Sequence, residues 1–256
     1  MGGGEDWIGR GTNDLMVALA FYTRLPFPDD RADAGAELAR ASWAAPVAGA
    51  VVGGIGALAY AVAHAAGLGP LPAAGVALVA TLVVTGALHE DGLADTADAF
   101  GSGASPEARL AIMRDSRIGT FGACALILSL GLRWAALASV AGPMRAAAAL
   151  IAAHAAARAM PPLLMLLIPP ARPDGLSADA GLPPADSVAG AALLGLAALM
   201  LGLGVLNGLI AAALLALCLA TMRWLALNKV GGQTGDVLGA LEQICEVVVL
   251  LVAARG

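Results

Sequence analysis

The chain has 256 residues, of which 59% are hydrophobic and 13% charged, and its formal net charge is −5. A mean hydropathy of +0.83 excludes an ordinary soluble domain, and the negative net charge argues against a nucleic-acid-binding protein. Apolar runs near or above the roughly 18 residues that cross a bilayer recur along the chain. We therefore expect an all-α fold, a polytopic membrane helical bundle that forms one integral membrane domain over residues 1–256.

The first 42 residues form a polar and interfacial segment. Residues 13–25 place apolar side chains at helical spacing but are too short to cross a bilayer, so we expect a short interfacial helix there. Pro26 and Pro28 would end that helix. Residues 29–40 are polar and charged, and we expect them to form a water-exposed connection.

Seven apolar runs follow within residues 43–253, and we expect each to form a transmembrane helix. The runs are 43–66, 71–88, 120–141, 144–168, 187–206, 208–227 and 237–253. In the first run, Gly49 and Gly53 form a G-x-x-x-G step. Small residues at this spacing let a second helix approach closely.

Positive charge lies mainly on one side of this seven-span topology. The N-terminal segment and the loops 89–119, 169–186 and 228–236 hold nine of the 14 lysine and arginine residues, whereas the opposite side holds only Arg145 and Arg255. Positively charged loops stay in the cytoplasm. The polar loops 89–119 and 228–236 are therefore predicted to be cytoplasmic.

The segment 88–101 gathers a histidine and four carboxylates, in the order His89, Glu90, Asp91, Asp95 and Asp98. In a helix the three aspartates stand at positions i, i+4 and i+7 and share one face. Carboxylates so placed repel one another unless a cation lies among them, and such oxygen ligands suit Mg²⁺ or Mn²⁺ holding a phosphate group. The alternative is a solvated acidic loop without a ligand.

Two further polar segments are predicted on the same side. In residues 114–119, Arg114 and Arg117 could hold phosphate through their guanidinium groups, or they could pair with the acidic segment or anchor the membrane surface. In residues 231–236, the glycine-rich turn with Gly232 and Thr234 could offer backbone N–H groups to an anion. Asp236 could be a fourth metal ligand or only the cap of the helix that follows.

Together these segments predict a metal-assisted phosphoryl or nucleotidyl transfer at the membrane surface. Asp95 stands in the middle of the acidic face. His89 and Glu90 are candidates for the general base, although both lie off the aspartate face of a regular helix. The sequence does not decide which of the two is the base.

Ionisable residues also lie inside the apolar runs: Arg133, His154, Arg158, Glu242 and Glu246. Each would cost at least about 2.5–3.5 kcal/mol if isolated in a bilayer, so partners are expected. His154 and Arg158 share one helix face and Glu242 and Glu246 share another. We predict that these two faces pair, either as a purely structural ion cluster or as the wall of a polar cavity.

Four motifs, in order along most of the chain, resemble those of the cobalamin synthase family, also called adenosylcobinamide-GDP ribazoletransferases. They are FYTRLPFP at 21–28, HEDGLADTAD at 89–98, RDSRIGTFG at 114–122 and GGQTGDVLGA at 231–240. One departure is Ala99, where the family pattern has a glycine. It concerns the local turn and leaves the carboxylates in place.

The resemblance implies a multi-pass enzyme of the inner membrane that requires Mg²⁺. It would join adenosylcobinamide-GDP to α-ribazole or its 5′-phosphate, releasing GMP and forming adenosylcobalamin or its phosphate. Asp91, Asp95 and Asp98 would hold the metal on the diphosphate, with Glu90 or Asp236 completing its ligands. Arg114 and Arg117 would steady phosphates. A homo-oligomer, or association with other enzymes of nucleotide-loop assembly, is a further expectation.

Two other classes of protein remain in view. A CDP-alcohol phosphotransferase also places several aspartates at membrane helix ends, but its pattern has Ala-Arg where this chain has Asp95-Thr96. A transporter or channel would explain Glu242 and Glu246 but would leave the clustered aspartates without a role.

Overall fold

The computed structural model describes residues 4–27, 34–103 and 105–255, and the elements in these ranges are helices apart from one bridge between Pro170 and Gln233. The N-terminal elements are α1 (Gly4–Tyr22), α2 (Ala34–Arg40), the 3₁₀ turn η1 (Ala41–Ala44) and α3 (Ala45–Ala65). The middle elements are α4 (Pro70–Thr85), α5 (Leu88–Gly101), α6 (Pro106–Ile112) and α7 (Thr120–Ser139). The remaining elements are α8 (Pro143–Arg158), α9 (Met160–Leu167), α10 (Leu176–Ala180), α11 (Ala185–Leu203), α12 (Val205–Val230) and α13 (Gly235–Ala253).

The all-helical membrane bundle is confirmed, but the count of seven spans is not. Among the described residues, five helical segments are long and apolar enough to cross a bilayer: 35–65, 120–139, 143–167, 185–203 and 205–230. A sixth arises only if α4 and α5, which are bent by 89°, count as one span. Of the other runs predicted to span, α4 alone has only 16 residues and α13 carries three carboxylates.

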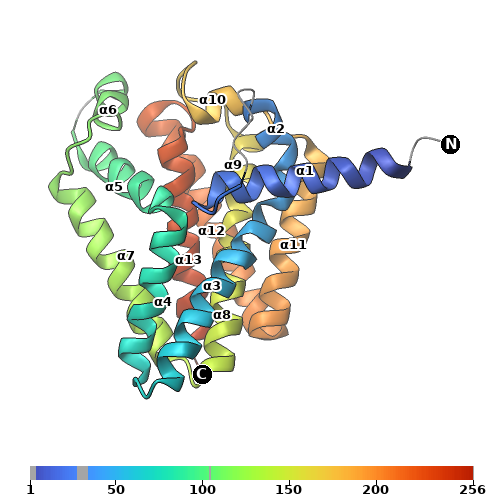
Figure 1. The fold of residues 1–256 in the computed structure, drawn as a ribbon. Helices are drawn as coiled ribbons and strands as arrows, with labels where there is room; N and C mark the ends of the chain where they lie inside the picture. Colours follow the sequence, from blue (N-terminus) through green and yellow to red (C-terminus); the bar gives the residue numbers. More distant parts are fainter. Residues whose placement is uncertain (1–3, 28–33, 104, 256) are drawn as a thin grey trace.

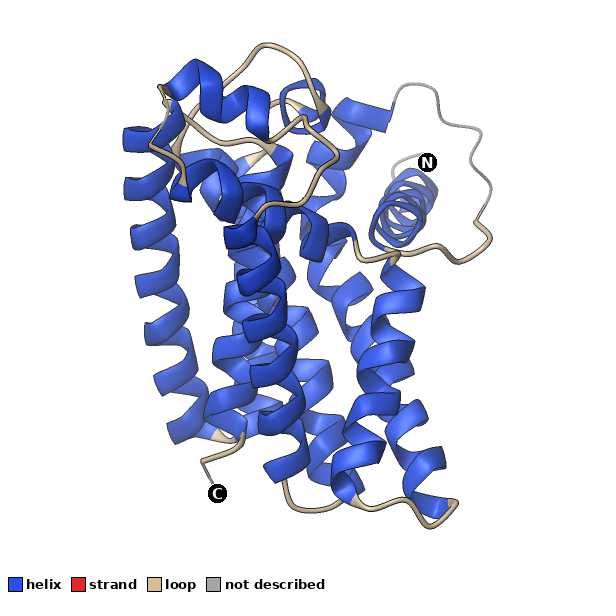
Figure 2. Ribbon diagram, turned by 90° about the vertical axis from the view of Figure 1, so that its left-hand side faces the viewer, coloured by secondary structure: helices blue, strands red, loops and turns tan. Residues whose placement is uncertain are grey.

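The polar elements gather at one end of the bundle. Helices α1, α2, α5, α6 and α10 lie at that end, and the C-terminus lies at the opposite end (Figure 1). Helix α1 runs across the bundle and is seen nearly end-on beside the N-terminus in Figure 2. The predicted interfacial helix therefore exists, but it begins at Gly4 and ends at Tyr22 instead of covering residues 13–25.

The prediction of an irregular connection at residues 29–40 is wrong for residues 34–40, which are helical. Residues 28–33 lie outside the described residues, but α2 begins at Ala34 and continues through η1 into α3. Asp14 of α1 holds this entry, because its carboxylate accepts hydrogen bonds from Arg40 Nε at 2.9 Å and Trp43 Nε1 at 3.1 Å. The helix that opens the bundle is thereby tied to the helix that lies across its end.

Helices α3 and α8 pack at backbone distance, as the G-x-x-x-G step predicts. A Cβ at Gly49 would overlap the carbonyl oxygen of His154, and one at Gly53 would lie 2.6 Å from that of Leu150. A Cβ at Gly54, on the same helix, would meet no atom within 4 Å. The close approach of α3 and α8 thus depends on Gly49 and Gly53, whereas Gly54 of the same helix does not contribute to it.

We predict that Gly49→Ala destabilises the folded protein by about 1–3 kcal/mol, because the new methyl group must push the α8 backbone away. The matched control is Gly54→Ala, which gains the same helix propensity on the same helix without a clash. Thermal unfolding of both variants in detergent checks the difference. Equal unfolding midpoints for the two variants would contradict this account of the α3–α8 contact.

Candidate active site

A sharp break between α4 and α5 turns the acidic segment across the end of the bundle. Gly86 has φ +64° and Ala87 has φ +57°, so two successive residues adopt the left-handed conformation that glycine tolerates and alanine resists. Helix α5 then restarts, and Asp91 N donates to Ala87 O at 3.0 Å. The acidic segment is helical, as the spacing predicts, and crosses the end of the bundle instead of running along it.

Glycines bring α5 against the first turns of α13. A Cβ at Gly92 would lie 2.8 Å from the backbone oxygen of Asp236, and a Cβ at Gly239 would lie 3.3 Å from the Cα of His89. A larger residue at either position would separate the helices. The contact places Asp236 beside the aspartates of α5, although about 140 residues separate them in the sequence.

A polar cavity of about 900 Å³ opens at this junction. Its wall includes two arginines and three of the predicted metal ligands, and it is lined by Arg24, Asp91, Asp95, Arg114 and Asp236. Glu90, Asp115 and Ser116 also reach this wall. The acidic segment, the 114–119 segment and Asp236 of the 231–236 segment therefore meet on one cavity wall, as predicted.

Arg24 is a member of this cavity that the sequence analysis did not assign. Its backbone N–H donates to Val84 O at 2.7 Å, and its guanidinium lies directly against Gly86, where a Cβ would overlap Nε. The only signal in the sequence was its place in the FYTRLPFP motif. The structure shows why that motif matters, since it brings a cation to the break between α4 and α5.

Burial and neighbouring carboxylates raise the proton affinity of Asp95. Burial first, and then the neighbouring charges of Asp91, Asp236 and Asp98, raise the pKa of Asp95 to about 6. Three hard oxygen donors on one cavity wall fit Mg²⁺, which keeps water and substrate oxygens among its ligands. They do not form a closed cage: in the described part of the chain, the three-residue group with ligating atoms within 4.8 Å is His154, Glu242 and Glu246.

Asp98, which the sequence predicts to be a metal ligand, binds backbone N–H groups at the start of α7. Its carboxylate accepts hydrogen bonds from Gly119 N at 2.7 Å and Gly122 N at 2.8 Å, so it caps the start of α7. A Cβ at Gly122 would overlap Asp98 Oδ2, which explains glycine there. Asp98 does not line the polar cavity but contributes to the negative potential at Asp95.

The glycine-rich turn builds structure and does not present Gly232 or Thr234 to the cavity. Gly232 packs against residues 169–171, where a Cβ would overlap Pro169 O. Gln233 N donates to Pro169 O at 2.9 Å. Thr234 caps α13, because its hydroxyl accepts from Val237 N at 3.2 Å, and it donates to Asp236 Oδ2 at 3.2 Å. The helix cap is therefore Thr234, which leaves Asp236 to face the cavity.

The two predicted phosphate arginines differ. Arg114 lines the cavity and bonds Asp174 through Nη2 at 2.6 and 2.7 Å. Arg117 is 86% exposed at its side chain and pairs with Asp115, whose pKa this hydrogen bonding lowers to about 2. Neither arginine pairs with the acidic helix, so that alternative is wrong. Of the two, Arg114 is placed to meet a ligand.

The predicted pairing of the two charged faces inside the bundle is confirmed. Arg158 Nη1 lies 2.8 Å from Glu242 Oε1, and His154 Nδ1 lies 3.0 Å from Glu246 Oε2. Each of these four side chains is at most 2% exposed. Glu242 and Glu246 thus meet arginine and histidine, and the guanidinium groups supply positive charge beside these buried carboxylates.

The same network extends to α5 through Arg133. The sequence predicts that Arg133 has a partner but does not indicate which residue it is. Arg133 Nη1 donates to Glu246 at 2.8 Å and Nη2 donates to Glu90 at 2.9 Å. His89 Nδ1 lies 3.3 Å from Glu242 Oε2. His89 and Glu90 are 5% and 7% exposed, so the network fixes the inner face of α5 while Asp91 and Asp95 face outward.

We predict that Arg133→Met destabilises the protein by about 3–5 kcal/mol, because it leaves Glu90 and Glu246 buried without that cation. The control is Arg117→Met, an exposed position where the change should stay within about 0.5 kcal/mol. Unfolding in detergent measures both. Equal stability of the two variants would show that Arg133 does not hold α5 to the bundle.

Comparison with known proteins shows which family the chain resembles. Curated proteins named adenosylcobinamide-GDP ribazoletransferase are similar over nearly the whole chain. That of Bradyrhizobium diazoefficiens is 54% identical over 98% of this chain and 96% of its own length. That of Mesorhizobium japonicum is 52% identical, with 94% and 93% covered, and that of Azorhizobium caulinodans is 50% identical, with 93% and 94% covered.

No solved structure matches the chain significantly. A sequence profile described as cobalamin-5-phosphate synthase matches residues 14–254, which include every residue of the polar cavity. The chain therefore belongs to the cobalamin-5-phosphate synthase family.

Proposed function

We propose that this chain is an adenosylcobinamide-GDP ribazoletransferase that works at the cytoplasmic face of the inner membrane. The observation that supports the proposal most is the meeting of Arg24, Asp91, Asp95, Arg114 and Asp236 on one cavity, in a chain whose relatives carry that name. Family membership favours this function over a CDP-alcohol phosphotransferase or a transporter.

The reaction is a substitution at phosphorus. A ribose hydroxyl oxygen of α-ribazole, or of its 5′-phosphate, bonds to the phosphorus that is attached to cobinamide. The bond from that phosphorus to the bridging oxygen breaks, GMP leaves, and the hydroxyl proton passes to a base. Such a transfer needs alignment and charge neutralisation more than covalent help from the protein.

The side chains divide these tasks. Arg24 and Arg114 would hold phosphate oxygens of adenosylcobinamide-GDP. Asp91, Asp95 and Asp236 would bind Mg²⁺, which when present supplies positive charge to the diphosphate oxygens. His89 is the base that we favour, since it lies at a cavity wall together with Asp91 and Asp236. Glu90 is the weaker candidate, because Arg133 already binds it.

We predict that Asp95→Asn lowers GMP release at least about 100-fold, because a carboxylate that would hold the metal on the diphosphate is lost. The assay combines detergent-solubilised protein, Mg²⁺, adenosylcobinamide-GDP and α-ribazole, and unfolding curves confirm that the variant is folded. Glu107→Gln, an exposed change on α6, is the control and should retain full activity.

Two outcomes of this assay would contradict the proposal at different levels. Near-normal activity of Asp95→Asn would remove Asp95 from the site. Absence of GMP above a protein-free control, with folded wild-type protein, would remove the transferase function altogether.

We also predict that divalent-ion affinity falls as the pH drops below about 6. Asp95 has a raised pKa of about 6, so it is ionised above that pH and protonated below it, where a proton competes with the metal. Equilibrium dialysis with Mn²⁺ should show affinity that is constant above about pH 7 and falls toward tenfold per pH unit below about pH 6. Asp95→Asn should lose this step. An unchanged affinity from about pH 7 to about pH 5 in the wild type would exclude Asp95 as a ligand.

A further inference from the structure

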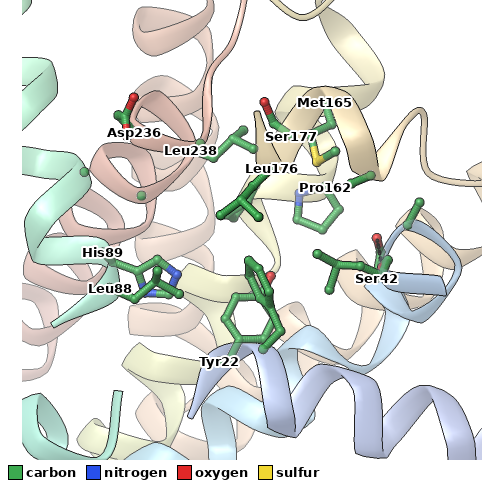
Figure 3. Close-up of a pocket in the computed structure, with 18 of the residues that line it drawn as sticks. Tyr22, Ser42, Leu88, His89, Pro162, Met165, Leu176, Ser177, Asp236 and Leu238 are labelled. Atoms are coloured by element: carbon green, nitrogen blue, oxygen red, sulfur yellow. Dashed lines mark hydrogen bonds between the residues drawn. The ribbon is translucent and has the colours of Figure 1, made fainter. Parts of the chain in front are cut away.

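A second cavity lies beside the polar one and has a different character. Its volume is about 200 Å³, and it is enclosed by elements α1, α2, η1, α5, α9, α10 and the start of α13. Figure 3 shows Tyr22 and His89 on one side, with Leu176, Pro162 and Met165 across from them. The two cavities share Phe21, Leu88, Asp91 and Asp236 in their walls.

The lining of this cavity suits a flat apolar ring. Tyr22 and Phe21 meet edge to face at 4.9 Å between ring centroids, and Tyr22 lies 5.7 Å from His89. Aliphatic and proline side chains complete the wall. A protein cavity of about 150 Å³ lined by apolar groups is sufficient to bind benzene, so this larger and partly open cavity can hold a fused two-ring system.

Polar groups are concentrated at the edge that faces the polar cavity. Asp91 and Asp236 line this edge, since they also line the polar cavity, and Ser42 lies toward the opposite side (Figure 3). A ligand with an apolar ring at one end and hydroxyl groups at the other would place its hydroxyl end beside the aspartates.

We propose that this cavity binds the benzimidazole base of α-ribazole, the acceptor nucleoside, while the polar cavity binds the charged diphosphate of adenosylcobinamide-GDP. The inference rests on the proposed function, which requires two substrates to meet at one phosphorus atom. Of the two, only the acceptor has a small, flat and apolar base. With the base in the smaller cavity, its ribose lies at the shared wall, next to His89 and Asp91.

The test measures binding and turnover separately. Ala39 is 5% exposed and lines the cavity, so Ala39→Phe should fill it. We expect the affinity for α-ribazole, measured by equilibrium dialysis with the full-length protein, to fall at least tenfold. The KM for adenosylcobinamide-GDP should change less than twofold. Ala36→Phe, an exposed position on the same helix, is the matched control and should leave both values unchanged.

Two further variants complete the experiment. Arg24→Gln, in the polar cavity, should raise the KM for adenosylcobinamide-GDP and leave α-ribazole affinity unchanged. Leu176→Trp replaces a residue that is 65% exposed and lines the smaller cavity, so it should reproduce the loss of α-ribazole binding even if Ala39→Phe does not fold.

Unchanged α-ribazole affinity in the folded cavity variants would overturn the proposal. If the folded cavity variants instead lose bound phospholipid, or lose affinity for adenosylcobinamide-GDP, the proposal is also overturned. The cavity would then belong to the molecule whose binding is lost. Failure of the proposed function can be distinguished from failure of the cavity assignment. If the proposed function is wrong, the wild type releases no GMP. If only the cavity assignment is wrong, Ala39→Phe still releases GMP and its KM for α-ribazole is unchanged.

Discussion

The site depends on Arg133, a guanidinium buried between two carboxylates of two different helices. In an apolar interior an unpaired charge is costly, and removing one member of a buried pair costs far more than an exposed pair contributes. Arg133 satisfies Glu246 of α13 and Glu90 of α5 at 2.8 and 2.9 Å. The positions of α5, α7 and α13 are therefore fixed relative to one another by a contact that tolerates little displacement.

This constraint determines what the outer face of α5 presents. Because His89 and Glu90 point into the ion network, helical geometry turns Asp91 and Asp95 toward the cavity. Gly92 and Gly239 then allow α13 to approach until Asp236 joins them. A single helix thus carries compensated charge on its inner face and uncompensated charge on its outer face.

Helical periodicity was sufficient to predict much of this arrangement. It predicted an all-helical membrane bundle, the shared face of Asp91 and Asp95, and the pairing of His154 and Arg158 with Glu242 and Glu246. It did not reveal that Asp98 caps α7, because the capping partners Gly119 and Gly122 lie more than 20 residues away and are set by tertiary packing. Gly232 and Arg24 depend likewise on contacts with Pro169 and Gly86, which no local pattern reveals. The seven-span count included α13 as a span. Its three carboxylates make it too polar to count as an apolar span, although most of its residues are buried in the bundle.

Helix α13 shows how the two kinds of charge are kept apart. Toward the middle of the helix, Glu242 and Glu246 each have an arginine at 2.8 Å, so each is paired within the protein. At its first turn, Asp236 has Arg172 at the longer distance of 3.8 Å, and it shares its cavity wall with the aspartates of α5. Negative charge on this helix is therefore available to a ligand only at the end that opens to the cavity. The buried network is in this sense part of the site, because it pairs the deeper carboxylates with arginines and leaves Asp236 facing the cavity.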